Sequence, residues 1–386
     1  MRLLICAGGT GGGVYPALAV LEALRSGLED KAGAGSPGLT HTRSLEVLWV
    51  GSSSGLEAEL IEREGITFEA IPSAGVHGVG WKALPGNLWE ILKGVFAAKK
   101  ILNRFRPDVI FYTGGYLAIP VGIASRLFSP GAGRPKNLAF VPDIEPGLAL
   151  KVLARLADRI AVTTEASMKY IPSEKKLTLT GYPVRKSLVS WELRTAMRAL
   201  NLVENLPTLL VFGGSKGARS INQATFEILK ALLRDMQVIH ITGYLDWPEA
   251  ERIKSTLGGE LLERYHAFPY LHEEMGAALL AADLVVSRAG ASILGEFPLF
   301  GKPAILVPYP YAWRYQEVNA RYLAARGAAV VLEDGELRDR LLSVIQKIIA
   351  DKDLLDQMRR AMSVLARPEA ASSIASLVFS LESSAG

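Results

Sequence analysis

The sequence contains a single cysteine, Cys6, among its 386 residues. No disulfide can therefore form within the chain, which excludes the class of small disulfide-stabilised secreted domains. Because Cys6 lies in the apolar run Leu3–Ala7, we interpret it as a thiol buried in a strand and not as a nucleophile. A reducing, cytoplasmic setting fits this composition.

Long apolar runs and a large charge excess are also missing. Only the short run Leu3–Ala7 precedes Gly8, and it is too short for the core of a secretory signal or for a membrane-spanning helix. The formal net charge of +4 is too small to indicate a nucleic-acid partner. We expect a protein that is not exported, does not span a membrane and does not bind nucleic acid.

The sequence does have the length and composition of a large α/β protein. Hydrophobic residues make up 49% of a chain that is too long for one ordinary domain. Short runs rich in Val, Ile and Leu alternate with helical patterns, which is typical of parallel strands joined by helices. The predicted strands form two series, Leu3–Ala7, Val47–Val50, Val109–Thr113, Leu138–Val141 and Ile160–Thr163, then Leu209–Phe212, Val238–Thr242, Leu284–Ser287, Ala304–Val307 and Ala329–Leu332.

Two series of strands predict two Rossmann-like, doubly wound domains that face a cleft. We expect an N-terminal domain over residues 1–185 and a C-terminal domain over 186–365, with 366–386 as a helix that returns to the first domain. Ligands of such sheets bind beyond the carboxyl ends of the strands.

A glycine-rich loop follows the first predicted strand. Its residues Thr10, Gly11, Gly12 and Gly13 lead into a helix that begins near Pro16. Glycines let the backbone approach a ligand closely, and the N–H groups at a helix N-terminus attract anions, although a simple tight turn is the alternative. The loop lacks the Lys-Ser/Thr ending of a nucleotide-triphosphate loop, and no acidic residue closes the next strand, which argues against a kinase or a dehydrogenase.

The second half carries three further candidate segments. Ser215 lies in another glycine-rich loop and can donate to a phosphate oxygen. Ala291 opens a helix in which Glu296 can accept hydrogen bonds from ribose hydroxyls, although a solvated helix glutamate is the alternative. Gln316 and Asn319 lie one helical turn apart, so both amides can point towards the hydroxyls of a sugar.

Taken in order from residue 1 to about residue 335, these motifs resemble the MurG family, which transfers N-acetylglucosamine from UDP-N-acetylglucosamine to lipid I and forms lipid II in peptidoglycan synthesis. The resemblance is carried by Gly8–Gly12, Tyr15–Ala19, Thr113–Tyr116, Gly181–Arg185, Gly213–Arg219, Ser287–Ala291, and Gln316 with Asn319 and Ala320.

The resemblance implies a GT-B fold, an inverting transfer without metal or cofactor, a lipid-linked acceptor on the first domain and the donor on the second. By matching position, Arg185 and Ser215 are expected to meet the diphosphate, Glu296 the ribose and Gln316 the sugar hydroxyls, while Phe268 presents backbone to uracil. Implied partners are UDP-N-acetylglucosamine, lipid I, the membrane surface and other proteins of cell-wall synthesis.

Two departures from the family pattern affect the acceptor side. Gly13 stands where the family loop normally ends in histidine, and Val141–Gly147 replaces the usual His-Glu-Gln-Asn stretch. We therefore take Asp143 and Glu145, which follow a predicted strand, as candidate general bases, with helix capping near Pro146 as the alternative role of Asp143. Two other functions stay open: a different GT-B lipid glycosyltransferase, or a UDP-sugar-binding protein with impaired catalysis.

Residues 81–100 predict a membrane-binding helix. Its aromatic and apolar side chains would enter the lipid interface while its lysines meet anionic head groups, which places the protein peripherally on the cytoplasmic face of the cell membrane. The alternative is an ordinary helix that buries Leu88, Leu92 and Phe96 in the core. The expected membrane contacts are Trp81, Trp89, Leu92, Phe96, Lys93, Lys99 and Lys100, with Lys82, Arg104 and Arg106 as further basic residues.

Overall fold

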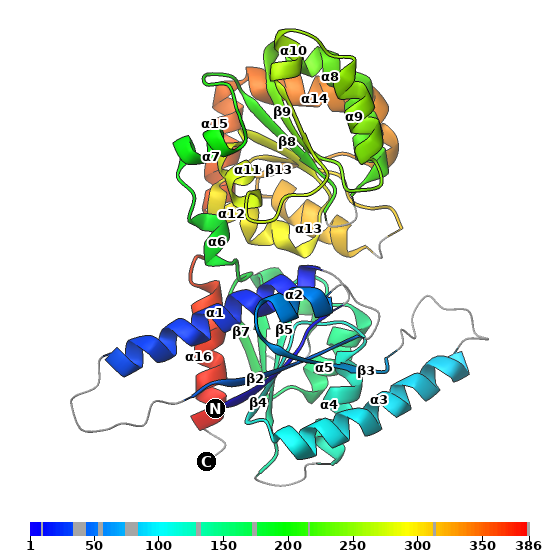
Figure 1. The fold of residues 1–386 in the computed structure, drawn as a ribbon, viewed down its shortest axis with the longest axis vertical. Coiled ribbons are helices and arrows are strands. Elements are labelled where there is room, and N and C mark those ends of the chain that lie inside the picture. Colours follow the sequence, from blue (N-terminus) through cyan, green and yellow to red (C-terminus); the bar gives the residue numbers. More distant parts are fainter. Residues whose placement is uncertain are drawn as a thin grey trace. The chain divides into compact units, whose positions relative to one another are not determined.

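The computed structural model describes residues 1–8, 11–33, 44–52, 57–73, 84–128, 133–171, 176–214, 217–311 and 314–383. The chain divides into two compact units (Figure 1). Unit 1 comprises Met1–Val184 together with Pro368–Gly386, and unit 2 comprises Arg185–Arg367. None of the described helices is long and apolar enough to cross a membrane.

Unit 1 is built on a parallel sheet of seven described strands in the order β3-β2-β1-β4-β5-β6-β7. The order reverses direction between β1 and β4, which creates the crevice where ligands of doubly wound sheets bind. The strands are β1 (Arg2–Cys6), β2 (Glu46–Ser52), β3 (Thr67–Ile71), β4 (Val109–Tyr112), β5 (Lys136–Val141), β6 (Arg159–Val162) and β7 (Leu177–Leu179). The helices are α1 (Gly11–Gly33), α2 (Glu57–Arg63), α3 (Leu84–Phe105), α4 (Ala118–Leu127), α5 (Leu148–Leu156), the 3₁₀ helix η1 (Glu165–Tyr170) and α16 (Ala370–Ser383).

The central strands of unit 1 are apolar on both faces because helices cover both sides of the sheet. β4 and the apolar stretch Leu3–Cys6 of β1 are completely buried. The C-terminal helix α16 crosses α1 and packs against it, and it also contacts β4 and β5 (Figure 1). Its residues Ile374 and Val378 are buried, so the end of the chain contributes to the core of unit 1.

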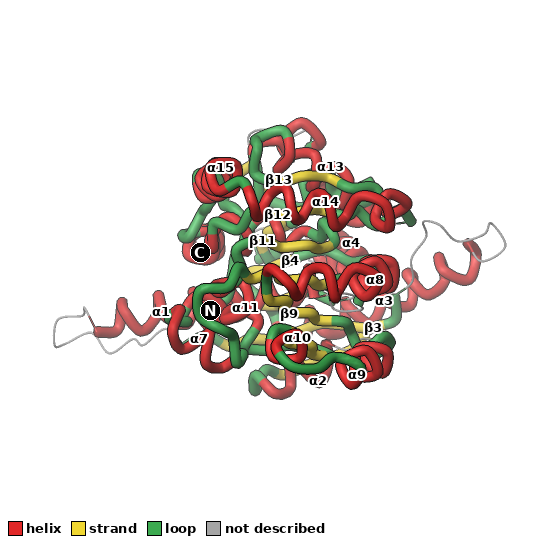
Figure 2. Tube along the Cα trace, turned by 90° about the horizontal axis from the view of Figure 1, so that it is seen from above, coloured by secondary structure: helices red, strands yellow, loops and turns green. Residues whose placement is uncertain are grey.

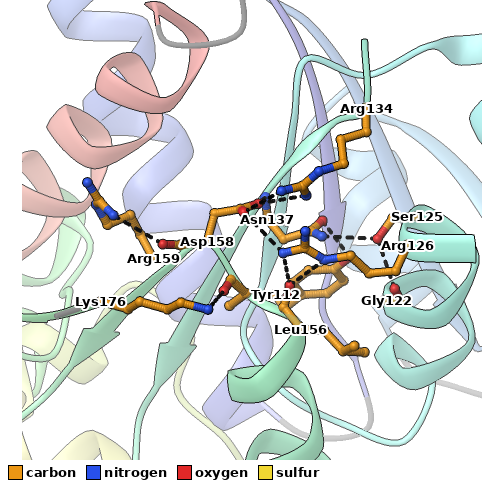
Figure 3. Close-up of polar contacts among 11 residues, drawn as sticks. Tyr112, Gly122, Ser125, Arg126, Arg134, Asn137, Leu156, Asp158, Arg159 and Lys176 are labelled. Carbon is orange, nitrogen blue, oxygen red and sulfur yellow. Dashed lines mark hydrogen bonds and ion pairs between the residues drawn. The ribbon is translucent and has the colours of Figure 1, made fainter. Parts of the chain in front are cut away.

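A partly buried polar network holds the start of β5 beside the start of β6 (Figure 3). The Asp158 carboxylate accepts hydrogen bonds from Arg134 Nη2 at 2.9 Å, from Arg126 Nη2 at 3.1 Å and from the Asn137 backbone N–H at 2.8 Å. Burial disfavours the charged form, yet these donors hold the pKa of Asp158 below its ordinary value. The network lies at the amino end of these strands, and we assign it a structural role.

Unit 2 is built on a second parallel sheet, with six described strands in the order β10-β9-β8-β11-β12-β13. Figure 2 shows the strands in yellow and the helices in red. The strands are β8 (Thr208–Phe212), β9 (Gln237–Ile241), β10 (Tyr265–Phe268), β11 (Leu284–Ser287), β12 (Ala304–Leu306) and β13 (Ala329–Val331). The helices are α6 (Lys186–Val189), α7 (Leu193–Ala199), α8 (Arg219–Asp235), α9 (Trp247–Ser255), α10 (Glu260–Glu263), α11 (Met275–Ala281), η3 (Ala291–Leu294), α12 (Glu296–Phe300), α13 (Tyr315–Ala324), η4 (Asp334–Glu336), α14 (Leu337–Ala350) and α15 (Lys352–Ser363).

A buried histidine supports the loop after β9. His240 Nε2 lies 3.1 Å from Asn222 Oδ1, and His240 Nδ1 lies 3.1 Å from the Tyr265 hydroxyl. Asn222 in turn donates to the Thr242 carbonyl at 2.8 Å and to the Asp246 carboxylate at 2.7 Å. Burial lowers the pKa of His240 to about 3, so this imidazole is neutral throughout the physiological range.

Candidate functional site

The crevice of unit 1 lies where the loops after β1 and β4 meet. Gly8 ends the described part of the first loop, Thr10 lies outside the described residues, and Gly11, Gly12 and Gly13 form the first turn of α1. The loop after β4 turns at Gly115, where φ is +87°. A Cβ at Gly115 would stand 3.3 Å from the Gly8 carbonyl oxygen, so the two loops approach each other closely.

Position 13 does not need glycine for its backbone conformation, because Gly13 lies within helix α1. A Cβ there would stand 3.3 Å from Thr113 Oγ1. The side chain of Thr113, which is one hundred positions away in the sequence, therefore lies close to Gly13. Because Gly11, Gly12 and Gly13 have no side chains, the first turn of α1 presents only its backbone.

Asp143 and Glu145 both follow β5, but their surroundings differ. Glu145 is only 3% exposed, and its carboxylate lies 3.6 Å from Lys151 Nζ. Asp143 is half-buried. The alternative role of Asp143 as a helix cap is wrong, because α5 begins at Leu148 with Gly147 as its N-cap and without a side-chain cap. Since a general base must reach its substrate, the more accessible Asp143 is the stronger candidate.

The glycine-rich loop of unit 2 is tightly packed against its own backbone and against the loop after β9. A Cβ at Gly213 would stand 2.3 Å from the Ala218 backbone nitrogen, and one at Gly217 would stand 2.6 Å from the Thr242 carbonyl oxygen. Only glycine fits at these two positions. Among the residues that the structure describes, nothing lies within 4 Å of a Cβ built at Gly214, so this position is open where the other two are crowded. The expected phosphate contact Ser215 lies outside the described residues.

Arg185 and Glu296, which are 111 positions apart in the sequence, interact electrostatically in unit 2. Burial raises the pKa of Glu296 to about 7, while a hydrogen bond from Ser292 and the charge of Arg185 oppose this rise. Arg185 immediately precedes α6, and Glu296 begins α12. The fold thus brings together one of the residues expected at the diphosphate and the residue expected at the ribose.

Gln316 and Asn319 differ in their roles. Gln316 Oε1 accepts a hydrogen bond from the Tyr309 backbone N–H at 2.9 Å. Asn319 is buried, and its Nδ2 donates to the Ala289 carbonyl at 3.1 Å. The amide of Asn319 is thus used inside the protein, where it fixes the loop before Ala291.

Phe268 and Ala291 complete the expected donor residues. Phe268 ends β10, and its carbonyl oxygen accepts a hydrogen bond from the Thr242 backbone N–H at 3.0 Å. Ala291 is buried at the start of η3, directly after β11 and its loop. Both residues lie beyond or at the carboxyl ends of strands in the sheet of unit 2.

Arg288 connects the start of α8, the start of η4 and the loop after β12 in unit 2, a role that the sequence did not reveal. It donates to the Asp334 carboxylate at 2.5 Å, to Ser220 Oγ at 2.7 Å and to the Val307 carbonyl at 3.2 Å. Its guanidinium also lies 5.2 Å from the ring centroid of Tyr309. The sequence places Arg288 in a recognisable motif, but no local pattern connects it with Asp334 or Ser220.

Helix α3 exposes apolar side chains on its outer face. Trp89 is 58% exposed, Phe96 is 52% exposed and Leu92 is 44% exposed. The alternative in which Leu88, Leu92 and Phe96 fill the core is therefore wrong, since Leu88 is exposed as well. The core face of α3 is instead formed by Val95, Ala98, Ile101 and Leu102.

Basic side chains accompany this apolar face. Lys93 pairs with Glu90 at 2.8 Å, Lys99 Nζ lies 4.4 Å from the ring centroid of Phe128, and Lys100 is exposed. Arg104 forms an ion pair with Glu69, and Arg106 is exposed. Trp81 and Lys82 lie outside the described residues.

Among the described residues, no group of three or more His, Cys, Asp or Glu side chains is placed to hold a metal ion.

The chain matches two family models, the glycosyltransferase family 28 N-terminal domain over residues 39–162 and the glycosyltransferase family 28 C-terminal domain over residues 208–374. Two similar curated relatives come from Desulforamulus reducens and from Roseiflexus sp. They are 39% and 38% identical to this chain, covering 97% and 99% of it and 97% and 95% of their own lengths. Both are named UDP-N-acetylglucosamine–N-acetylmuramyl-(pentapeptide) pyrophosphoryl-undecaprenol N-acetylglucosamine transferase.

Among solved structures, the chain is similar to a crystal structure of MurG from Acinetobacter baumannii. The TM-score is 0.72 at 22% identity, with 98% of this chain and 99% of that chain covered. This likeness confirms the predicted GT-B fold of two Rossmann-like domains.

Proposed function

Because the chain belongs to glycosyltransferase family 28, we propose that it transfers N-acetylglucosamine from UDP-N-acetylglucosamine to lipid I and so forms lipid II of peptidoglycan synthesis. The observation that carries this proposal is the similarity, over nearly the whole chain, to relatives named for that transfer. The Arg185–Glu296 interaction in unit 2 supports it, because it brings a cation for the diphosphate close to an acceptor for ribose hydroxyls.

In the proposed donor site, Arg185 and Ser215 bind the diphosphate, Glu296 accepts hydrogen bonds from the ribose, and Phe268 and Ala291 present backbone to the nucleotide. Gln316 binds the sugar hydroxyls and is oriented by its bond to the Tyr309 N–H. As the bond from the anomeric carbon to UDP breaks, negative charge grows on the diphosphate, and the Arg185 guanidinium stabilises it.

On unit 1, the acceptor approaches the first turn of α1, formed by Gly11, Gly12 and Gly13. Asp143 takes the proton of the attacking sugar hydroxyl, which then forms the new bond to the anomeric carbon with inversion. Glu145 is the second candidate base, but its burial and its ion pair with Lys151 favour a supporting role.

We further propose that α3 binds the cytoplasmic face of the cell membrane, where a lipid-linked acceptor resides. Trp89, Leu92 and Phe96 enter the interface, and Lys93, Lys99 and Lys100 meet anionic head groups. Exposed apolar side chains flanked by lysines on one helix support this assignment. Other proteins of cell-wall synthesis are further proposed partners.

Transfer from labelled UDP-N-acetylglucosamine to a lipid I analogue tests the function. Formation of the disaccharide lipid is the expected result. Transfer to a diacylglycerol or another lipid, but not to lipid I, would indicate a different GT-B lipid glycosyltransferase. UDP binding without any product above that of a Glu296→Ala control would indicate a UDP-sugar-binding protein with impaired catalysis.

A further inference from the structure

Arg288 forms an ion pair inside unit 2 with a largely buried guanidinium. Only 10% of its side chain is exposed, and its Nη1 lies 2.5 Å from Asp334 Oδ1. Its Nη2 donates to Ser220 Oγ at 2.7 Å, and Ser220 Oγ in turn donates to Asp334 at 2.8 Å. Because the carboxylate of Asp334 neutralises the guanidinium, we assign Arg288 no direct contact with the diphosphate.

The same guanidinium holds the segment that follows β12. Arg288 Nη1 donates to the Val307 carbonyl oxygen at 3.2 Å and to the Pro308 carbonyl oxygen at 3.4 Å. Val307 and Pro308 are buried, and buried carbonyl groups need a hydrogen-bond donor. The ring of the next residue, Tyr309, lies within the range of a cation–π contact with the guanidinium. Arg288 therefore fixes the backbone up to Tyr309.

Tyr309 in turn orients the side chain of Gln316. Its backbone N–H donates to Gln316 Oε1 at 2.9 Å. Because this bond uses the oxygen of the amide, Gln316 Nε2 is the end that can donate to a hydroxyl oxygen of a ligand. A series of contacts thus connects Asp334 in η4 with Gln316 in the first turn of α13.

We propose that the hydrogen-bonded ion pair of Arg288 and Asp334 positions Gln316 for the sugar of the donor. It does so by anchoring residues 307–309, whose last backbone N–H orients the Gln316 amide. Both members of the pair are positioning residues, since they act through Gln316 and do not touch the ligand. The inference rests on the proposed function, which assigns the hydroxyls of N-acetylglucosamine to Gln316.

Asp334→Ala tests this role, because it removes the partner of Arg288 at a partly exposed position and leaves Gln316 in place. The specificity constant kcat/KM for UDP-N-acetylglucosamine, measured with a lipid I analogue, is expected to fall about tenfold. The dissociation constant for UDP, measured by calorimetry, is expected to stay within about threefold, because UDP lacks the sugar that Gln316 binds. Equal losses for UDP and UDP-N-acetylglucosamine would mean that the ion pair only supports the fold of unit 2, and would overturn the inference.

Two control variants isolate the hydrogen bond. Asp334→Asn keeps an oxygen that can accept from Arg288, so its kcat/KM is expected to stay within about threefold of that of the unchanged protein. Asp339→Ala removes a nearby exposed carboxylate in the first turn of α14 and should leave kcat/KM unaltered. A loss in either control as large as that in Asp334→Ala would contradict positioning through this bond.

A double variant tests whether the ion pair acts through Gln316. Gln316→Ala is expected to lower kcat/KM for UDP-N-acetylglucosamine at least as much as Asp334→Ala, because it removes the sugar contact itself. Gln316→Ala/Asp334→Ala is then expected to lose no more than Gln316→Ala alone. Losses that multiply would show that the two positions act independently, and an unaltered kcat/KM in Gln316→Ala would show that the pair acts on another group; either result would overturn the inference.

Arg288→Lys provides a second test that does not depend on the folding of Asp334→Ala. Lysine keeps the charge but lacks the forked donors that reach several acceptors at once, so the same selective loss for UDP-N-acetylglucosamine is expected. If the unchanged protein transfers no sugar to lipid I, the proposed function fails instead. Calorimetric affinities of the variants for UDP-N-acetylglucosamine and UDP still test the positioning role in that case, because they need no acceptor.

Discussion

At the scale of single residues, Glu296 illustrates how burial and charge compete at one carboxyl group. Burial raises its pKa to about 7 against the opposing effects of Ser292 and Arg185. The group therefore changes its charge close to neutral pH, and only its ionised form can accept hydrogen bonds with both oxygens. Its proposed contact with the ribose consequently depends on pH in the range where the protein works.

Glu296→Ala is expected to weaken UDP binding by about tenfold or more, which corresponds to losing a hydrogen bond to a charged group. Calorimetric titration with UDP measures this, with Glu249→Ala on the exposed surface of α9 as the control. In the unchanged protein, UDP affinity should also fall as the pH drops below about 7. An unchanged dissociation constant would remove Glu296 from the donor site.

Substitutions of Asp143 and Glu145, the two carboxylates after β5, should have different effects on the reaction. Asp143→Asn is expected to lower kcat by roughly 100-fold or more, the usual contribution of a general base, with little effect on UDP affinity. Glu145→Gln should affect kcat less and lower the melting temperature, because its removal leaves Lys151 without the buried partner of its ion pair. Steady-state kinetics with both substrates and thermal unfolding provide the comparison; a larger loss of kcat in Glu145→Gln would reverse the assignment.

His240 predicts how the stability of unit 2 depends on pH. Its pKa is about 3 in the folded protein against 6.5 ordinarily, so between these values the unfolded chain binds a proton that the folded chain does not. The free energy of unfolding should therefore decrease as pH falls below 6.5, by up to about 1.4 kcal/mol per pH unit.

Urea titrations of the unchanged protein and of His240→Gln, between pH 7 and pH 4.5, measure this effect. The variant should show a shallower dependence, whereas His272→Gln, at an exposed position, should follow the unchanged protein. Glu296 acts in the opposite direction: its folded pKa of about 7 exceeds the ordinary 4.5, so its contribution to stability is lost as pH rises between those values. Parallel curves for His240→Gln and the unchanged protein would exclude the imidazole as the cause.

At the scale of helices and strands, α3 presents one apolar face to the core and a second one outward. The inner face is buried, whereas Trp89 and Phe96 are more than half exposed. Phe96 lies 6.3 Å from Phe128, measured between ring centroids, so the outer face extends to the end of α4. Such a continuous exposed apolar surface indicates an interaction with lipid or protein.

Replacing Trp89 and Phe96 together by Ser should release the protein from vesicles that contain anionic lipid, with only a small change in melting temperature. Vesicle co-sedimentation and thermal unfolding measure the two effects. Leu262→Ser with Val364→Ser, two exposed positions of unit 2, is the matched control and should leave vesicle binding unaltered. A collapse of thermal stability would mean that Trp89 and Phe96 support the core.

The predicted strands were confirmed where the sheet is covered on both faces, because those strands are apolar throughout. The strands that the pattern missed are β3, β7 and β10, and each lies at the edge of its sheet. β7 is only partly buried along its length, and β10 contains His266, so neither has a continuous apolar run. The contacts of Arg288 and Thr113 could not be predicted from local sequence patterns, because their neighbours come from segments distant in the sequence.

At the scale of the whole molecule, unit 1 is assembled from both ends of the chain. α16 buries Ile374 and Val378 and packs against α1, so these two residues should stabilise unit 1 and leave unit 2 largely unaffected. Ile374→Ala with Val378→Ala is expected to cost roughly 3–7 kcal/mol of unfolding free energy. Because the elements that α16 contacts, α1, β4 and β5, all belong to unit 1, this loss is expected in unit 1.

Calorimetry with and without UDP separates the units, because a ligand raises the melting temperature of the unit that binds it. The double variant should lower the transition that UDP does not shift. The surface variant Ser372→Ala/Ser380→Ala, on the same helix, is the control. A decrease in the transition that responds to UDP would mean that α16 stabilises unit 2.

Because α16 belongs to unit 1 but follows unit 2 in the sequence, unit 1 receives its last helix only after unit 2 has been synthesised. Residues 185–367 of unit 2 are synthesised before Pro368–Gly386, so the whole of unit 2 is made while the first unit still lacks a helix. Domains usually fold in the order in which they are made. Here, however, the unit that begins the chain is the last to be completed, because α16 is made after unit 2. Until Pro368–Ser383 has been made, the surface of the first unit that α16 covers therefore stays open.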